Sequence, residues 1–201
     1  MTTSVERWVL ASASPRRREI LSGLGLRFRI KPSVVAEPPR ERSEPPSRYA
    51  ARAARLKARA VARNLQGGVV IGADTVVVMR DRLLGKPSSR EEARSMLRSL
   101  SGRWHEVITG ICLIDCRIMR EVSSCAVSRV HFRRVSEAEL QWYLDTGEYS
   151  DKAGAYAIQG YASLFVDRIE GCYFNIVGFP VSTFEKLCRR LGISLTGKKR
   201  H

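Results

Sequence analysis

The sequence of 201 residues lacks the patterns that would place it in a membrane, outside the cell or around a structural metal. No apolar run approaches the roughly 18 residues of a membrane span, and the N-terminus has no charged-then-apolar signal pattern. The five cysteines include no Cys-x-x-Cys pair, and the three histidines form no metal-ligating spacing. We therefore expect reduced thiols in a cytoplasmic protein, with neither a structural zinc nor a membrane partner.

Several nucleotide-binding and hydrolase motifs are missing as well. Gly85-Lys86 is followed by Pro87 rather than serine or threonine, and the earlier glycine of a P-loop is replaced by Arg80. No Gly-x-Gly-x-x-Gly follows a strand pattern, and no Gly-x-Ser-x-Gly elbow occurs. These absences exclude the P-loop, dinucleotide-binding and serine-hydrolase classes.

Acidic residues are few relative to basic ones, at 20 against 35, which gives a net charge of +15. Such an excess indicates a polyanionic partner: nucleic acid, anionic lipid or phosphorylated small molecules. A hydrophobic content of 44% is ordinary for a globular protein. The length suits one domain over 1–196, and we expect the basic tail 197–201 to be disordered.

The most informative stretch is 69–78, Val-Val-Ile-Gly-Ala-Asp-Thr-Val-Val-Val. Its β-branched residues predict a strand buried on both faces, in which Asp74 is the exception. A buried carboxylate is costly unless cations, hydrogen bonds or a metal compensate it. Either the strand ends at Gly72 and Asp74 caps a turn, or Asp74 belongs to a site with the nearby turn lysine, Lys86.

A second group of cations follows the first predicted strand, 7–12. Ser14 and Pro15 are typical of a helix start, where backbone N–H groups and the helix dipole attract anions. The side chains that add donors at this turn are those of Ser12, Arg16 and Arg17. Three successive arginines at the positive end of a helix are unfavourable without a negative partner. We therefore favour an anion site over an ordinary basic, solvated turn.

A basic helix is predicted over 47–64, with five arginines spaced three or four apart on one face. Lys57 falls on the opposite side, among alanines. The arginines look like a solvated face, whereas Lys57 lies where the helix should be buried. Lys57 could reach the surface along its own stem, but we expect it to point into a site.

The rest of the chain mixes helices and strands without strict alternation, which predicts an α/β protein with a mixed, largely antiparallel-edged sheet. The predicted strands are 26–31, 104–114, 118–132, 164–169 and 174–177, and the predicted helices are 88–100, 136–146 and 182–191. The segment 151–161 is small and flexible, with polar residues at Lys152 and Gln159. This composition suits a substrate-lining loop.

Several cations around one or two carboxylates suit a polyphosphate substrate with a divalent metal. The cations are Arg16, Arg17, Lys57, Lys86 and Lys152, and the acids are Asp74 and Glu37. Hydrolysis of a nucleotide phosphoanhydride is therefore the best chemical interpretation of the residues.

The sequence resembles the Maf-like nucleotide pyrophosphatases over nearly its whole length. The motifs that carry the resemblance are LASASPRRREIL at 10–21, Lys57-Ala58, IGADTVV and GKP within 71–87, SGRWHEVITG at 101–110, SDKAGAYAIQG at 150–160 and NIVGFP at 175–180. The resemblance implies hydrolysis of a nucleoside triphosphate to the monophosphate and pyrophosphate with Mg²⁺ or Mn²⁺. It also implies a single Maf-like catalytic domain: a two-lobed mixed sheet flanked by helices with a central cleft, like that of inosine triphosphate pyrophosphatases.

The resemblance assigns roles to residues of this sequence. Asp74 would accept a proton or activate water, with Lys57 and Lys86 as catalytic partners, and Glu37 and Asp74 would bind the metal. The expected substrate-binding and specificity residues are Ser12, Arg16, Arg17, Thr75, Lys152 and Gln159. Two motifs depart from the family pattern: its Asp-Glu pair is Ala36-Glu37 here, so that metal binding leans on Glu37, and its Val-Gly-Leu-Pro is Val-Gly-Phe-Pro.

Arg16, Thr75 and Gln159 match the branch that acts on dTTP and UTP rather than the branch that acts on 7-methyl-GTP. Two alternatives come from other classes: a basic nucleic-acid-binding module and a non-catalytic regulator of cell division. The intact Asp74, Lys57 and Lys86 argue against lost catalysis, and no specific nucleic acid is expected. A homodimer is compatible with the sequence.

Overall fold

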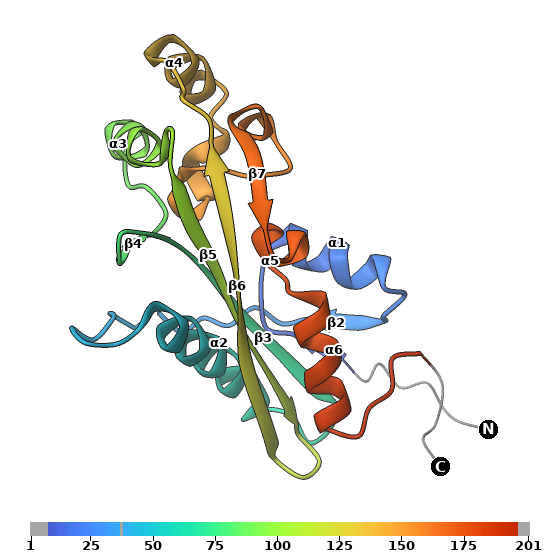
Figure 1. Ribbon diagram of the computed structural model, residues 1–201. Coiled ribbons are helices and arrows are strands. Elements are labelled where there is room, and N and C mark those ends of the chain that lie inside the picture. Colours follow the sequence, from blue (N-terminus) through green and yellow to red (C-terminus); the bar gives the residue numbers. More distant parts are fainter. Residues whose placement is uncertain (1–7, 37, 197–201) are drawn as a thin grey trace. The chain divides into compact units, whose positions relative to one another are not determined.

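The computed structural model describes residues 8–36 and 38–196 and shows a mixed sheet flanked by helices (Figure 1). The strands of this described part are β1 (Trp8–Leu10), β2 (Phe28–Ile30), β3 (Val69–Met79), β4 (Arg82–Leu84), β5 (Trp104–Asp115), β6 (Arg120–Phe132) and β7 (Val166–Glu170). Their hydrogen-bonded order is β2-β1-β3-β5-β6-β7, with β4 added to β3. β1 pairs in parallel with β2 and β3, whereas the β3–β4 and β6–β7 pairs are antiparallel. The mixed sheet predicted from the sequence is thereby confirmed.

The helices are α1 (Pro15–Gly23), α2 (Pro46–Ala62), α3 (Arg90–Leu100), α4 (Glu137–Asp145), α5 (Tyr173–Val177) and α6 (Val181–Arg190), with short 3₁₀ turns at Glu148–Asp151, Ala153–Ala155 and Tyr161–Phe165. The chain forms two compact units. Unit 1 contains the described residues of 1–74, 109–126 and 178–201, and unit 2 contains 75–108 and 127–177. Strands β3, β5 and β6 contribute residues to both units. The cleft expected between two lobes stays a prediction.

Unit 1 is a three-layer structure, in which α2 covers one face of its strands while α1 and α6 cover the other (Figure 1). Side chains alternate along each strand, so that neighbouring residues join different cores. The core under α1 and α6 includes Leu10, Leu21, Ile71, Ala73, Phe179 and Phe184. The core under α2 includes Val9, Ala54, Ala58, Val61, Val70 and Cys112. Two separate apolar cores therefore hold β1 and β3 from both sides.

Helix α2 approaches the strands unusually closely, because small residues line the contact. A Cβ atom added at Gly72 would lie 2.3 Å from the carbonyl oxygen of Ala54, and one at Gly110 would lie 2.1 Å from that of Ala50. Neither distance is compatible with a real side chain. Gly72 thus permits the close approach of α2 to β3, and Gly110 permits its close approach to β5.

In unit 2, β3 and β4 form a hairpin around Arg80 and Asp81, whose φ values are 49° and 65°. Two consecutive residues with positive φ are typical of the type I′ turns that join such hairpins. Gly85 and Lys86 directly follow β4, the second strand of this hairpin.

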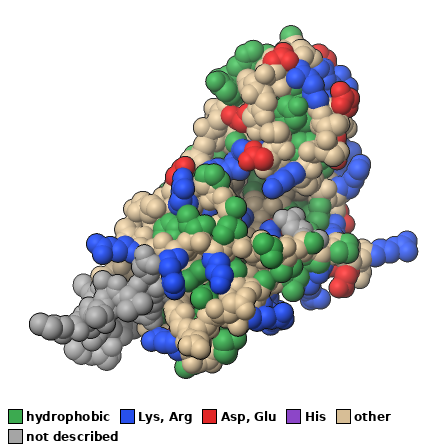
Figure 2. Space-filling model, turned by 180° about the vertical axis from the view of Figure 1, so that it is seen from behind, with side chains coloured by type: hydrophobic (Ala, Val, Ile, Leu, Met, Phe, Trp, Pro, Cys, Tyr) green, Lys and Arg blue, Asp and Glu red, His purple; other side chains and the backbone are tan. Residues whose placement is uncertain are grey.

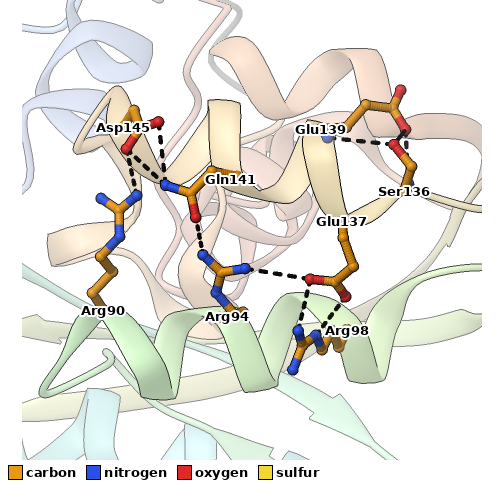
Figure 3. Close-up of polar contacts among 8 residues, drawn as sticks. All are labelled: Arg90, Arg94, Arg98, Ser136, Glu137, Glu139, Gln141 and Asp145. Carbon is orange, nitrogen blue, oxygen red and sulfur yellow. Dashed lines mark hydrogen bonds and ion pairs between the residues drawn. The ribbon is translucent and has the colours of Figure 1, made fainter.

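Charged side chains join α3 and α4 on the surface of unit 2 (Figure 3). Arg98 donates hydrogen bonds to both carboxylate oxygens of Glu137, at 2.6 and 2.7 Å. Further along the two helices, Arg94 binds Gln141 and Arg90 binds Asp145. A capping box begins α4, since Ser136 and Glu139 bond to each other's backbone N–H groups. These contacts are exposed, so each adds little to stability.

One predicted strand is wrong. Residues 174–177 lie in the helix α5 rather than in a strand. The side chain of Asn175 explains the difference, because it is buried and donates to the carbonyl oxygen of Val107 and to Ser128 Oγ. A short apolar segment has a weak intrinsic preference, which such tertiary contacts override.

Basic side chains are spread over the face shown in Figure 2, with neutral and hydrophobic side chains between them, and they form no continuous patch on its described part. Among the residues that the structure describes, no helix is long and apolar enough to cross a membrane. The tail 197–201, predicted to be disordered, lies outside the described residues.

The close approach of α2 predicts that Gly110→Ala destabilises the protein. The new methyl group would overlap backbone atoms of α2, which cannot move aside as a side chain could. We expect a loss of about 1–3 kcal/mol in the free energy of unfolding, measured by urea denaturation. Gly23→Ala is the control, because its Cβ meets no atom within 4 Å, and alanine there should leave stability equal or raise it by less than about 1 kcal/mol. Equal effects of the two changes would contradict the close contact.

Candidate functional site

Asp74 lies inside β3 and is 4% exposed. The alternation of β3 places it on the face that carries Val70 and Gly72, which is the face covered by α2. Lys57 Nζ donates a hydrogen bond of 2.5 Å to Asp74 Oδ1, and the Lys57 side chain is 17% exposed. The strand continues to Met79, so the interpretation in which it ends at Gly72 is wrong. Lys57 points inward, as its position on the helix predicted.

Arg17 holds the backbone next to Asp74 from the other face of the sheet. It is 9% exposed, and its Nη1 donates to the carbonyl oxygen of Ala73 at 2.9 Å and to Ser12 Oγ at 3.0 Å. Its Nε donates to the carbonyl oxygen of Gly178 at 2.9 Å. Arg17 therefore joins three segments of unit 1 that are far apart in the sequence.

The start of α1 has the features of the predicted anion site. Ser14 is the N-cap residue, but its side chain makes no capping hydrogen bond, and the first turn contains no acidic residue. Pro15 begins the helix, and Arg16 is half-buried. The positive end of this helix dipole is thus not neutralised by an acidic side chain in its first turn.

Glu37, the predicted metal ligand, lies outside the described residues. Within the described part of the chain, no group of three or more His, Cys, Asp or Glu residues could hold a metal ion. Asp74 is therefore the single described residue of the predicted metal pair. A lone carboxylate oxygen donor of this kind fits Mg²⁺, which is commonly held by one or two carboxylates together with substrate phosphates.

The remaining predicted residues lie in unit 2. Thr75 is half-buried, Lys86 is exposed, and the Lys152 side chain is 18% exposed and paired with Asp151. The backbone N–H of Gly154 donates to the carbonyl oxygen of Gly85 at 3.0 Å. This bond ties the turn that carries Lys86 to the segment that carries Lys152, two positions that are 66 residues apart in the sequence.

The arginines of the α2 face form ion pairs with glutamates, whereas the sequence indicated a solvated face. Arg52 forms two hydrogen bonds with Glu44, at 2.7 and 2.6 Å, and these lower the pKa of Glu44. Arg55 and Arg59 both bind Glu121 of β6. Burial alone would raise the pKa of Glu121, but these two hydrogen bonds hold it below its usual value. The two acidic partners were missed, because neither lies at a helical spacing from its arginines.

Comparisons with known proteins agree with these observations. A family model described as "Maf-like protein" matches residues 7–191. A dTTP/UTP pyrophosphatase of Desulforamulus reducens is 46% identical over 93% of this chain and 97% of that protein. A dTTP/UTP pyrophosphatase of Syntrophomonas wolfei is 45% identical over 92% of this chain and 98% of that protein. The match to a solved structure, that of a nucleoside-triphosphatase/dITP/XTP pyrophosphatase from Mycobacterium abscessus, covers 92% of this chain and 97% of that one. The sequence identity is 14% and the TM-score is 0.45.

The buried pair predicts that Lys57 and Arg55, two cations of one helix, differ in their effect on stability. Lys57→Met leaves the Asp74 carboxylate buried without its cation, and we expect the free energy of unfolding to fall by about 3 kcal/mol. Arg55→Met removes a charge that is 44% exposed, and the loss should stay below about 1 kcal/mol. Urea denaturation at pH 7 measures both, and equal small losses would refute the burial of the Lys57 pair.

Proposed function

We propose that this chain, which belongs to the Maf-like protein family, hydrolyses dTTP and UTP to the monophosphate and pyrophosphate. The curated relatives that support this proposal carry the name dTTP/UTP pyrophosphatase and align over nearly their whole length. Arg16, Thr75 and Gln159 favour the same branch over the 7-methyl-GTP branch. All five cysteines are free thiols, which fits a reducing compartment, and we propose the cytoplasm.

The observation that carries the proposal is the buried ion pair between Lys57 and Asp74. Hydrolysis breaks the phosphoanhydride link between the α- and β-phosphates. The oxygen of a water molecule bonds to phosphorus at the point of cleavage, and the monophosphate and pyrophosphate separate. Asp74 would orient this water and accept its proton, while Lys57 keeps the carboxylate ionised and held in one position. The backbone at Ala73, fixed by Arg17, limits the movement of the carboxylate.

A divalent metal, Mg²⁺ or Mn²⁺, would be held by Asp74 and by phosphate oxygens of the substrate, with Glu37 as a second ligand. When bound, it would neutralise negative charge that develops on the phosphates. Arg16 and the N–H groups at the start of α1 would bind phosphate oxygens, because that helix end carries no acidic side chain in its first turn. The roles of Lys86 and Lys152 as phosphate ligands stay predictions.

A binding module for nucleic acid is less well supported. Three arginines of the α2 face, Arg52, Arg55 and Arg59, are engaged by glutamates of the same unit. Phosphates of a nucleic acid would have to compete with these carboxylates. The Lys57–Asp74 pair also has no part in such a function.

Asp74→Asn tests the chemistry. The amide keeps the size of the side chain but can neither accept the proton nor bind a metal as a carboxylate does. We expect pyrophosphate release from dTTP to fall by about 10²–10⁴-fold, with circular dichroism showing a folded protein. Retention of more than about a tenth of the wild-type turnover would refute the role of Asp74.

Gln159 tests the choice of base. Its amide offers one donor and one acceptor, the pattern that pairs with the O4 and N3–H of thymine or uracil. Cytosine reverses this pattern, so we expect dTTP and UTP to be hydrolysed well and CTP and dATP poorly. Glutamate has no donor for O4, and Gln159→Glu should therefore lower the preference for dTTP over CTP by about 10²-fold or more.

The measurement is pyrophosphate release across the four nucleotides. Gln66→Glu is the matched control, because it makes the same change at an exposed residue of unit 1 and should leave the preference unaltered. A wild-type enzyme that prefers a purine triphosphate would refute the proposed substrates. If Gln159→Glu changed stability but not selectivity, Gln159 would have no part in base recognition.

A further inference from the structure

The segment 154–160 presents one side chain to solvent. Residues 154–158 are buried, Gly160 is half-buried, and Gln159 is exposed. The Gln159 side chain makes no hydrogen bond to any other residue of the described chain. It therefore does not hold its own loop by a side-chain hydrogen bond within the described residues. The orientation of its amide depends on how firmly other residues hold the backbone.

The segment begins with a strained backbone. Gly154 and Ala155 have φ values of 69° and 62°, in the left-handed region that alanine rarely adopts. A Cβ atom at Gly154 would lie 2.9 Å from Val77 Cγ1, so the loop is packed directly on β3. Strain of this kind persists only where the surroundings impose it, and such places are frequently ligand sites.

A buried pair of rings fixes the middle of the segment. The Tyr156 hydroxyl lies 2.8 Å from His105 Nε2, and both rings pack edge-on against Phe132. Burial lowers the pKa of His105 to about 4. The ring is therefore neutral at pH 7, and one hydrogen bond joins its Nε2 to the Tyr156 hydroxyl, with the donor set by the tautomer of the ring.

A carboxylate fixes the far end. Glu148 Oε2 accepts the backbone N–H of Tyr161 at 2.9 Å, and Oε1 accepts that of Ala162 at 3.4 Å and the hydroxyl of Tyr143 at 3.0 Å. A Cβ atom at Gly160 would lie 1.8 Å from Glu148 Oε2. The carboxylate thus occupies the space beside Gly160, immediately after Gln159.

We propose that Glu148 and His105 are positioning residues for base selection, holding from two sides the loop that presents Gln159. The inference rests on the proposed function, and it adds residues that do not touch the nucleotide. An amide distinguishes thymine from cytosine only if it meets the base in one orientation. Glu148 accepts hydrogen bonds from the backbone that follows Gln159, and His105 holds the side chain of Tyr156, three residues before Gln159.

The experiment compares Glu148→Ala with Glu137→Ala in the full-length protein. Both changes remove a unit 2 glutamate that accepts several hydrogen bonds, but Glu137 binds only arginines of α3 in the contacts drawn in Figure 3. We expect Glu148→Ala to lower the ratio of kcat/KM for dTTP over CTP by about 10-fold or more. Glu137→Ala should leave this ratio within about twofold of wild type.

Hydrogen exchange gives a readout that does not depend on activity. The amides of Tyr161 and Ala162 lose their acceptor in Glu148→Ala and should exchange faster, whereas Glu137→Ala should not affect them. If Glu148→Ala does not fold, Glu148→Gln keeps the side chain's size and one acceptor oxygen. Tyr156→Phe removes the bond to His105 without changing the ring, and it should lower the selectivity ratio in the same way.

An unchanged ratio in the folded Glu148 and Tyr156 variants would overturn the inference while leaving the proposed function intact. A wild-type enzyme that releases no pyrophosphate from dTTP or UTP would instead refute the proposed function, and the inference with it. Because wild type is measured first, the two failures are distinguished before any variant is compared.

Discussion

The ion pair between Lys57 and Asp74 is the constraint on which the rest of unit 1 depends. A carboxylate inside a buried strand is costly unless it is compensated, and here the cation of Lys57 reaches it through the core. Lys57 can do so only if α2 lies close to β3. The alanines of α2 and the glycines at positions 72 and 110 make this approach sterically possible. The small residues of the helix and the glycines of two strands thus allow the Lys57 cation to reach the Asp74 carboxylate.

The opposite face of the sheet completes this arrangement. Because side chains alternate along β3, Asp74 faces α2 while Ala73 faces the core of α1 and α6. The carbonyl of Ala73 accepts a hydrogen bond from Arg17, which also binds the carbonyl of Gly178. Asp74 is consequently fixed twice, through its side chain by Lys57 and through its backbone by Arg17. A carboxylate held on a strand in this way is suited to chemistry that requires a fixed oxygen position.

Periodic patterns in the sequence predicted the long elements well. The strand around Asp74, the two strands after 104 and the basic helix all occur, and the angular position of Lys57 on its helix placed it correctly against the core. The five-residue helix α5 was predicted as a strand, because so short a segment carries almost no periodic signal. The hydrogen bond of Arg17 to Gly178 joins residues 161 positions apart in the sequence. The Glu148 carboxylate binds backbone N–H groups, which every residue except proline carries. Neither kind of contact has a local sequence pattern.

The groups proposed to act on water and the loop proposed to recognise the base are held by different physical means. Asp74 is fixed by a buried charge pair, which any substitution of a partner disrupts strongly. The loop around Gln159 is fixed by a buried neutral ring pair and by backbone N–H groups on the Glu148 carboxylate. Each set of bonds lies within its own unit, so that a change in the loop leaves the charge pair intact. If Gln159 reads the base as proposed, substitutions near it would alter base preference without removing the groups proposed to act on water.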